Sequence, residues 1–359
     1  MRRREFLKAA TSASATPTVD VPLRDLAAAR HIRFGTEATW RDLAQDPAYA
    51  RLVAHECAIL TPGIEAKWPV VEPSEGEFQF GDLDRIVAFA QRNALALHMH
   101  NLVWAVGLPS WTLTALTKGR GTAVMARHIA ATVGRYRGHV DSWDVVNEPI
   151  DPRWPSGPEG LCTTPWRRAL GPDYVPDALC EARAADGGAR LLINDDDLEY
   201  DAPDREQKRT LYLRLIENWL KRGVPLTGFG LEAHIKPWLR IAEQPYRRFL
   251  RELASFGLIL YVTEFDVCDR TLPGDIDARD RAVAWCAKNY LDLVLDEPAV
   301  KVLITWGLAD NTSWMSRDPA ARRADGLAPR PLPYDARLRA KPMRNAIAAA
   351  LRAAPCRSA

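Results

Sequence analysis

The sequence predicts an α/β fold, a single-domain (β/α)8 or TIM barrel, because strand-like and helix-like segments alternate along the chain. The strand-like segments are short apolar runs ending in polar residues, at residues 32–39, 58–67, 94–104, 140–148, 190–196, 227–234, 258–266 and 300–310. Amphipathic segments lie between them, at residues 83–92, 123–136, 208–222, 246–256 and 279–295. Strands that alternate with helices indicate a parallel sheet. Eight such units in roughly 320 residues fit a barrel, since barrels of this type span about 200 to over 400 residues.

An open, doubly wound parallel sheet is the structural alternative. That fold usually has a glycine-rich phosphate-binding turn after its first strand. The first predicted strand contains Gly35, followed by Thr36, Glu37 and Ala38, which do not form such a turn. We therefore predict the barrel, in which the polar ends of the strands converge on one mouth that holds the active site.

The charge balance and hydropathy exclude some classes of partner. The 359 residues include 48 Lys+Arg and 46 Asp+Glu, which gives a formal net charge of +2. Domains that bind nucleic acid usually have a basic excess. No run of about 18 apolar residues, the length that spans a bilayer, occurs. We expect no nucleic-acid partner, no membrane contact and a monomeric protein.

The chain divides into three predicted parts. Residues 1–25 form a leader and disordered N-terminus, residues 26–352 the catalytic barrel and residues 353–359 a C-terminal tail. The leader contains Arg3-Arg4-Glu5-Phe6-Leu7-Lys8, which resembles a twin-arginine export signal, and Ala13-Ser14-Ala15 is a candidate cleavage site. This predicts a periplasmic or secreted protein, with a cytoplasmic protein as the alternative. The six cysteines fit neither a C-x-x-C metal pattern nor a dense disulfide framework.

Two predicted strands end in a carboxylate. The fourth run reads Trp143-Asp144-Val145-Val146-Asn147-Glu148, and the seventh reads Leu260-Tyr261-Val262-Thr263-Glu264. A buried glutamate is costly unless it is paired or has a chemical task. Retaining glycoside hydrolysis needs two carboxyl groups about 5–5.5 Å apart, and strands across a barrel mouth can provide that separation. The pair therefore predicts a glycoside hydrolase.

At these residues the chain resembles glycoside hydrolase family 10, best known for endo-β-1,4-xylanases. The resemblance extends from about Phe34 to Leu351. Residues 143–149 resemble the acid/base motif of the family, and residues 263–266 resemble its nucleophile motif. Further blocks match in order: Leu102-Val103-Trp104, Leu108-Pro109-Ser110-Trp111, Ile193-Asn194-Asp195, Glu232-Ala233-His234, Thr305-Trp306-Gly307, Ser313-Trp314 and Lys341-Pro342.

The resemblance implies a role for each matching residue. Glu148 is the general acid/base and Glu264 the nucleophile, and Asn147 contacts the 2-hydroxyl of the reacting sugar. His234 hydrogen-bonds Glu264, and Asp266 orients the His234 ring. The implied substrate-binding residues are Lys67, His100, Trp104, Asn194, Glu232, Trp306 and Trp314. The resemblance implies a β-linked polysaccharide or oligosaccharide as substrate, no cofactor and no metal.

Several positions depart from the family pattern. Gly63-Ile64 replace a Glu-Asn pair that holds the sugar beyond the reacting unit, and Ala105 and Gly107 replace a His and a Gln. Glu232 replaces a Gln, and Asp196-Asp197 replace a Tyr-Asn pair. These changes predict a weaker grip on a xylan chain and a wider glycone region, on the non-reducing side of the scissile bond. Glu232 would bring a third carboxylate close to Glu264, and like charges that close raise one pKa.

Two other classes of protein remain as alternatives. A metal-dependent barrel hydrolase is one, because His98 and His100 lie two apart on a strand and point to the same face, as zinc ligands can. A non-catalytic glycan-binding barrel is the other, since several sugar contacts have changed. Retention of both Glu148 and Glu264 argues against it, because binding alone needs no proton donor opposite a nucleophile.

Overall fold

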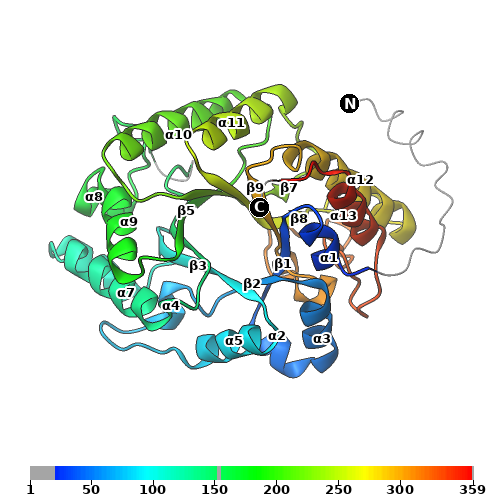
Figure 1. Cartoon of the computed structure of the whole chain (residues 1–359), viewed down its shortest axis with the longest axis horizontal. Helices are drawn as coiled ribbons and strands as arrows, with labels where there is room; N and C mark the ends of the chain where they lie inside the picture. Colours follow the sequence, from blue (N-terminus) through cyan, green and yellow to red (C-terminus); the bar gives the residue numbers. More distant parts are fainter. Residues whose placement is uncertain (1–20, 152–154, 358–359) are drawn as a thin grey trace.

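The computed structural model describes residues 21–151 and 155–357, which form a closed parallel barrel (Figure 1). The strands are β1 (Arg33–Ala38), β2 (Ile59–Pro62), β3 (Ala96–Trp104), β4 (Ser142–Asn147), β5 (Arg190–Asp195), β6 (Gly228–Leu231), β8 (Ile259–Val267) and β9 (Val300–Thr305). The two-residue strand β7 (His234–Ile235) extends the edge beside β8. Neighbours pair in parallel, and the β6–β8 and β1–β9 pairings close the ring. The predicted barrel is confirmed, with one strand in each of the eight predicted runs.

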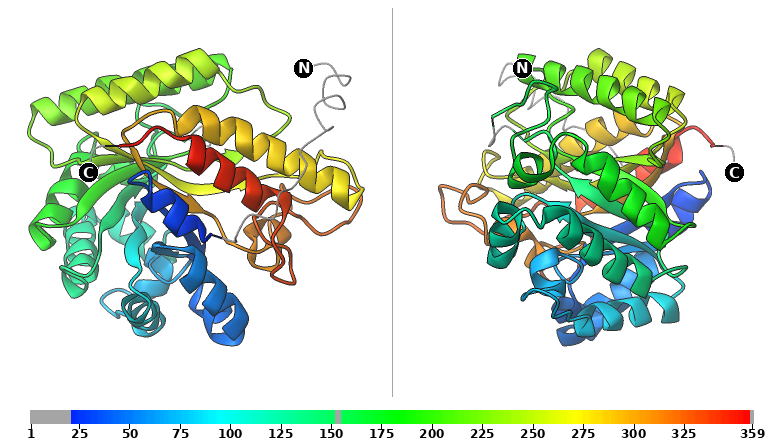
Figure 2. Two further views of the ribbon diagram at one scale, coloured as in Figure 1. Left: turned by 45° about the vertical axis from the view of Figure 1, so that its right-hand side comes forward. Right: turned by 90° about the vertical axis from the view of Figure 1, so that its left-hand side faces the viewer.

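Helices surround the strands on the outside of the barrel (Figures 1 and 2). They are α1 (Leu23–Ala28), α2 (Trp40–Gln45), α3 (Pro47–Glu56), α4 (Trp68–Val71), α5 (Gly81–Arg92), α6 (Ser110–Thr117), α7 (Gly121–Arg135), α8 (Pro165–Leu170), α9 (Tyr174–Ala185), α10 (Pro203–Lys221), α11 (Glu243–Ser255), α12 (Ile276–Val294) and α13 (Pro342–Ala353). Two 3-10 turns, η1 (Asp310–Thr312) and η2 (Trp314–Ser316), follow β9.

The five predicted amphipathic segments correspond to α5, α7, α10, α11 and α12. Each helix ends within one residue of the predicted end but begins two to five residues earlier. Most residues in the first turns are polar, glycine or proline, as at Pro203 in α10, and so carry no apolar periodicity. The exceptions are Ile276 and Ala278 of α12, where the side chain of Asp275 caps the helix by accepting a hydrogen bond from the Ala278 amide. First turns with few apolar residues therefore explain most of the late predicted starts.

Two apolar layers hold the barrel together. The larger core lies between the strands and the helices and includes Phe34, Trp143 and Phe229. A smaller cluster joins Ile59, Leu192, Tyr261, Val302 and Ile304 from four different strands. Strands that are not neighbours can share such contacts only inside the ring, so this cluster fills the barrel interior, as in other barrels of this type. The interior is packed, and the polar chemistry is left to the strand ends.

The ends of the described chain pack on the barrel. Residues 1–20 of the predicted leader, including Arg3 and Arg4, lie outside the described residues, whereas α1 begins at Leu23, inside the predicted leader. In the predicted tail, Arg357 is buried and donates hydrogen bonds to the carbonyl oxygens of Val300 (2.9 Å) and Leu295 (2.7 Å). No helix in residues 21–151 or 155–357 is long and apolar enough to cross a membrane, and all six cysteines are free.

A buried ion pair ties the start of the chain to the last helix. Glu56, at the end of α3, accepts hydrogen bonds from the Arg344 guanidinium of α13 (2.9 Å) and the Tyr334 hydroxyl (2.7 Å). Its second oxygen accepts from the Leu23 amide at the start of α1 (2.8 Å). Glu56 is 1% exposed and Arg344 5% exposed. Three segments far apart in the sequence therefore share one buried carboxylate.

We expect Glu56→Ala to lower the free energy of unfolding by about 3–5 kcal/mol, because it removes the carboxylate partner of a buried guanidinium. Glu217→Ala is the control. It removes an exposed pair with Lys221 on α10, and its effect should not exceed about 0.5 kcal/mol. Urea unfolding followed by tryptophan fluorescence measures both. Equal effects of the two substitutions would show that the Glu56 pair does not tie these segments together.

Candidate active site

The polar strand ends meet at one mouth of the barrel. Glu148 follows β4 directly, Glu264 lies in the second half of β8, and Glu232 follows β6. The chain turns sharply after two of these strands, since Glu148 has φ 48° and Ala233 has φ 64°. Such left-handed conformations are uncommon for residues other than glycine and are often found at functional sites. The Glu148 amide donates a hydrogen bond to the Asn194 carbonyl (2.9 Å), which holds that turn against β5.

Glu264 is a buried carboxylate surrounded by donors. One oxygen accepts a hydrogen bond from the Asn194 amide (2.9 Å) and lies 3.7 Å from His100 Nδ1. The other lies 3.3 Å from His234 Nε2. Burial raises the pKa of Glu264, but His100, His234 and Lys67 outweigh it, so the pKa is lower than in water. Glu264 is therefore ionised at neutral pH, as a nucleophile requires.

His234 connects Glu264 to Asp266. Its Nδ1 lies 2.9 Å from an oxygen of Asp266, and the Trp314 indole N–H donates to the other oxygen of that carboxylate (2.8 Å). Burial lowers the pKa of His234, but Asp266 and Glu264 raise it well above its ordinary value. The imidazolium consequently donates to a carboxylate at each ring nitrogen, and its ring orientation is fixed.

Asn194 joins the two predicted catalytic residues. Its side-chain amide donates to the Asn147 oxygen (2.9 Å) as well as to Glu264, and its oxygen accepts from the Thr263 hydroxyl (2.7 Å). Asn147 in turn donates to a carboxylate oxygen of Glu148 (3.3 Å). The sequence predicts Asn194 only as a substrate-binding residue. Because Asn194 lies on β5 and hydrogen-bonds residues of both β4 and β8, it orients both sides of the site.

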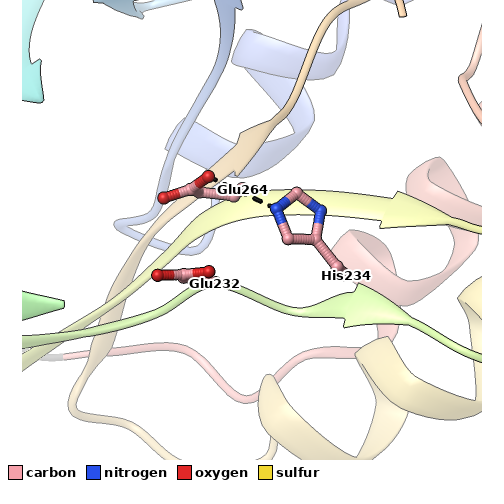
Figure 3. A group of neighbouring side chains, drawn as sticks. All are labelled: Glu232, His234 and Glu264. Atoms are coloured by element: carbon pink, nitrogen blue, oxygen red, sulfur yellow. Dashed lines mark ion pairs between the residues drawn. The ribbon is translucent and has the colours of Figure 1, made fainter. Parts of the chain in front are cut away.

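Glu232 lies beside Glu264 and His234, as Figure 3 shows. One ligand atom from each of these three residues lies within 4.8 Å of the others. Glu232 is 4% exposed and also accepts a hydrogen bond from Asn194 (3.2 Å). Burial raises the pKa of Glu232 well above its ordinary value, and the neighbouring Glu264 and Glu148 charges raise it further. Glu232 is therefore the carboxyl of this pair that keeps its proton to higher pH, next to Glu264, which ionises more readily.

Aromatic rings and one lysine line the side of the site next to Glu264. The Lys67 ammonium lies 5.0 Å from the centre of the Trp104 ring and 5.9 Å from that of Trp306. His100 meets Trp306 edge to face at 5.2 Å, and the rings of His234 and Trp314 are 5.1 Å apart. The predicted substrate-binding residues on these strands and loops are thus brought together, with rings suited to the apolar face of a sugar.

His98 and His100 do point to the same side of β3, but they share a carboxylate. His98 Nε2 (3.0 Å) and His100 Nδ1 (2.9 Å) contact the same oxygen of Asp144. His98 Nδ1 also contacts the Ser142 hydroxyl (2.9 Å). Burial opposes the ionisation of Asp144, but both histidines outweigh it and lower its pKa to about 2. Asp144, whose role the sequence did not predict, thus occupies one ring nitrogen of each histidine, and Asn101 contacts His100 Nε2. Both ring nitrogens of each histidine therefore already have a partner, which argues against the metal hypothesis.

One predicted consequence of the family departures is wrong for Gly107. Gly107 does not widen the site, because a Cβ atom there would lie 2.6 Å from Cε3 of Trp104, whose ring fills the space.

Asp196 and Asp197, which replace the Tyr-Asn pair, are both paired with cations. Lys208 contacts Asp196 at 2.9 Å, and Asp197 pairs with Arg205 (2.8 Å) and Lys236. These cations offset the negative charge of the two carboxylates.

Comparisons with known proteins agree with this geometry. A model of the family described as glycosyl hydrolase family 10 matches residues 22–350. Endo-1,4-beta-xylanase B of Thermotoga neapolitana is 32% identical over 301 residues, which are 82% of this chain and 83% of that protein. Endo-1,4-beta-xylanase C of Phanerodontia chrysosporium is 32% identical over 346 residues, with 93% and 80% covered.

Solved structures show the same similarity. The crystal structure of xylanase 10B from Thermotoga maritima superposes with a TM-score of 0.80 at 30% sequence identity, covering 92% of this chain and 98% of that one. Xylanase 10B from Thermotoga petrophila, solved in complex with xylobiose, gives a TM-score of 0.80 at 29% identity, with 94% and 98% covered.

We expect Glu232→Gln to leave the acidic limb of the pH–rate profile in place and to move the alkaline limb to lower pH. Glutamine is neutral and of similar size, so it imitates Glu232 in the protonated form that its raised pKa favours. When wild-type Glu232 ionises at higher pH, its charge opposes loss of the Glu148 proton, and the variant lacks this effect. Profiles of kcat/KM on an aryl glycoside measure both limbs. Movement of the acidic limb alone would mean that Glu232 is already charged when Glu264 titrates.

Proposed function

This chain belongs to glycosyl hydrolase family 10, and from that premise we propose that it is an endo-acting retaining hydrolase of β-1,4-linked xylan or a closely related polysaccharide. The named relatives, which are endo-1,4-beta-xylanases, support this substrate class. One observation carries the proposal: His100 and His234 keep Glu264 of β8 ionised. Asn194 holds that carboxylate and also Asn147, which donates to the half-buried Glu148 that follows β4.

The reaction takes place in two displacements. In the first, a carboxylate oxygen of Glu264 attacks the anomeric carbon, the glycosidic C–O bond breaks, and Glu148 donates its proton to the departing oxygen. This leaves a sugar covalently bound to Glu264. In the second, water attacks the same carbon and gives a proton to Glu148, and Glu264 leaves as a carboxylate. Two inversions restore the β configuration in the product.

The surrounding groups support both steps by positioning and charge. His234 stabilises Glu264 as a carboxylate before attack and when it departs. Asn194 holds both Glu264 and Asn147, so the Asn147 amide is in place for the 2-hydroxyl of the reacting sugar. The raised pKa of Glu232 favours its neutral form, which adds no charge beside the nucleophile. Each of these roles can be tested by a single substitution.

We expect Glu264→Ala to remove nearly all activity on every substrate, because no covalent intermediate can form. Glu148→Ala should lower kcat/KM on xylan by about 10²- to 10⁴-fold. Its effect should be much smaller on aryl glycosides with acidic phenols, because these leaving groups need little protonation. Product NMR should show a β anomer first, and a 2-fluoro glycoside should label Glu264. An α anomer as the first product would contradict the retaining mechanism, and absence of labelling would favour a binding protein without catalysis.

We also propose that the enzyme is exported through the twin-arginine pathway and acts as a monomer. A polymeric substrate lies outside the cell, which favours export, and the candidate site is built from a single chain. Changing Arg3 and Arg4 to Lys should retain the protein in the cytoplasm, because that pathway reads the arginine pair. Fractionation of cells that express either form measures this. Equal periplasmic recovery of the two forms would contradict export by this route.

A further inference from the structure

Glu37 occupies the space that a side chain at position 63 would need. Glu37 lies near the end of β1 and pairs in register with Thr61 of β2, two residues before Gly63. A Cβ atom built on Gly63 would lie 1.8 Å from a carboxylate oxygen of Glu37 and 2.8 Å from its Cδ. No positive φ is found at Gly63, so it is the position of Glu37, and not the backbone, that excludes a side chain there. A side chain at position 63 and the Glu37 carboxyl would therefore occupy the same space.

The Glu37 side chain is mostly buried, and its carboxyl has no hydrogen-bond partner among the described residues. The residue is 8% exposed, and no hydrogen bond or ion pair to its side chain occurs in residues 21–151 or 155–357. A buried polar group is costly unless it is hydrogen-bonded, and such groups in folded proteins nearly always have a partner. Glu37 consequently has capacity for a partner that the protein itself does not provide.

The Glu37 carboxyl is on the same side of Glu264 as the rings of Trp104 and Trp306. The Lys67 ammonium lies over Trp104 and Trp306, and its positive charge acts on both Glu37 and Glu264 in favour of their ionised forms. A Cβ atom on Gly307, the residue after Trp306, would be 3.9 Å from the second oxygen of Glu37. The resemblance to the family implies that these rings, and the side chain at position 63, bind the glycone sugars. Glu37 thus faces the region where those sugars bind.

Burial keeps the Glu37 carboxyl protonated near neutral pH. Burial is the main cause that raises its pKa to about 8, and the carboxylates of Asp42 and Glu65 add to the effect. Lys67 and Arg317 act in the opposite direction but do not outweigh burial. A protonated carboxyl has one O–H to donate and oxygen lone pairs to accept, which matches a sugar hydroxyl in both directions.

We propose that Glu37 binds a hydroxyl of the sugar next to the reacting one on the glycone side, and so replaces from strand β1 the carboxyl that Gly63 cannot provide. The proposal rests on the proposed function and names a residue that determines its specificity. The sequence predicts that no side chain at position 63 binds this sugar, and the proposal assigns that contact to Glu37 instead. The Asn of the family pair is not replaced, because Ile64 is an exposed apolar side chain.

Paired aryl substrates and a swap of the two positions test this proposal. The quantity measured is the kcat/KM on aryl β-xylobioside divided by that on aryl β-xyloside, since only the first places a second sugar near Glu37. We expect Glu37→Ala to lower this ratio by about tenfold or more. Gly63→Ala should lower it as well, because the added methyl group displaces Glu37. Glu37→Gln, which keeps a donor and an acceptor, should stay within about threefold of wild type.

The decisive variant is the double substitution Glu37→Ala with Gly63→Glu. It restores a carboxyl in the same place from the neighbouring strand, so the ratio should recover at least partly from its value in Glu37→Ala. A purely structural role for Glu37 would lower both rate constants together and leave the ratio unchanged. An unchanged ratio in Glu37→Ala, with active wild type, would overturn the proposal alone. Wild type that hydrolyses neither aryl glycoside would instead overturn the proposed function.

Discussion

The carboxylate of Glu264 has to be charged inside a largely buried barrel mouth, and the surrounding structure follows from that requirement. An isolated buried carboxylate would take up a proton. His234 prevents this by donating to Glu264, but a buried imidazolium needs its own counter-charge, which Asp266 provides. Trp314 then donates to the remaining oxygen of Asp266. The chain of contacts ends at this neutral indole, and its one imidazolium lies between two carboxylates.

The same requirement explains why Glu232 can stand next to Glu264. Two ionised carboxylates at that distance would repel each other strongly, so one of the pair keeps its proton. The raised pKa falls on Glu232, which lacks the histidine contacts that Glu264 has. On β4, Asp144 carries a further negative charge between His98 and His100. Charges of both signs thus alternate around the barrel, and the closed ring of strands fixes their spacing.

The glycone side shows how neighbouring strands can exchange a chemical group. A position-by-position comparison registers a lost carboxyl at Gly63 and a lost side chain at Gly107. In three dimensions the Glu37 carboxyl fills the first space and the Trp104 ring the second. β1 and β2 run side by side in register, so a group that leaves one strand can be supplied by the other. The absence of a motif side chain therefore leaves no empty space where a side chain from a neighbouring strand or residue fills it.

The sequence by itself determined the barrel, the family and the two glutamates at the ends of β4 and β8. Apolar runs, amphipathic segments and motif residues are local features, so they can be recognised before the chain is folded. Only the tertiary structure decided which side chains meet. Asn194 as the junction between strands, Asp144 between two histidines, Glu37 in the space beside Gly63 and the cations around Asp197 all depend on contacts across strands or between loops. Those contacts are fixed by strand register and barrel closure, which bring together residues from distant parts of the sequence, and no local pattern records them.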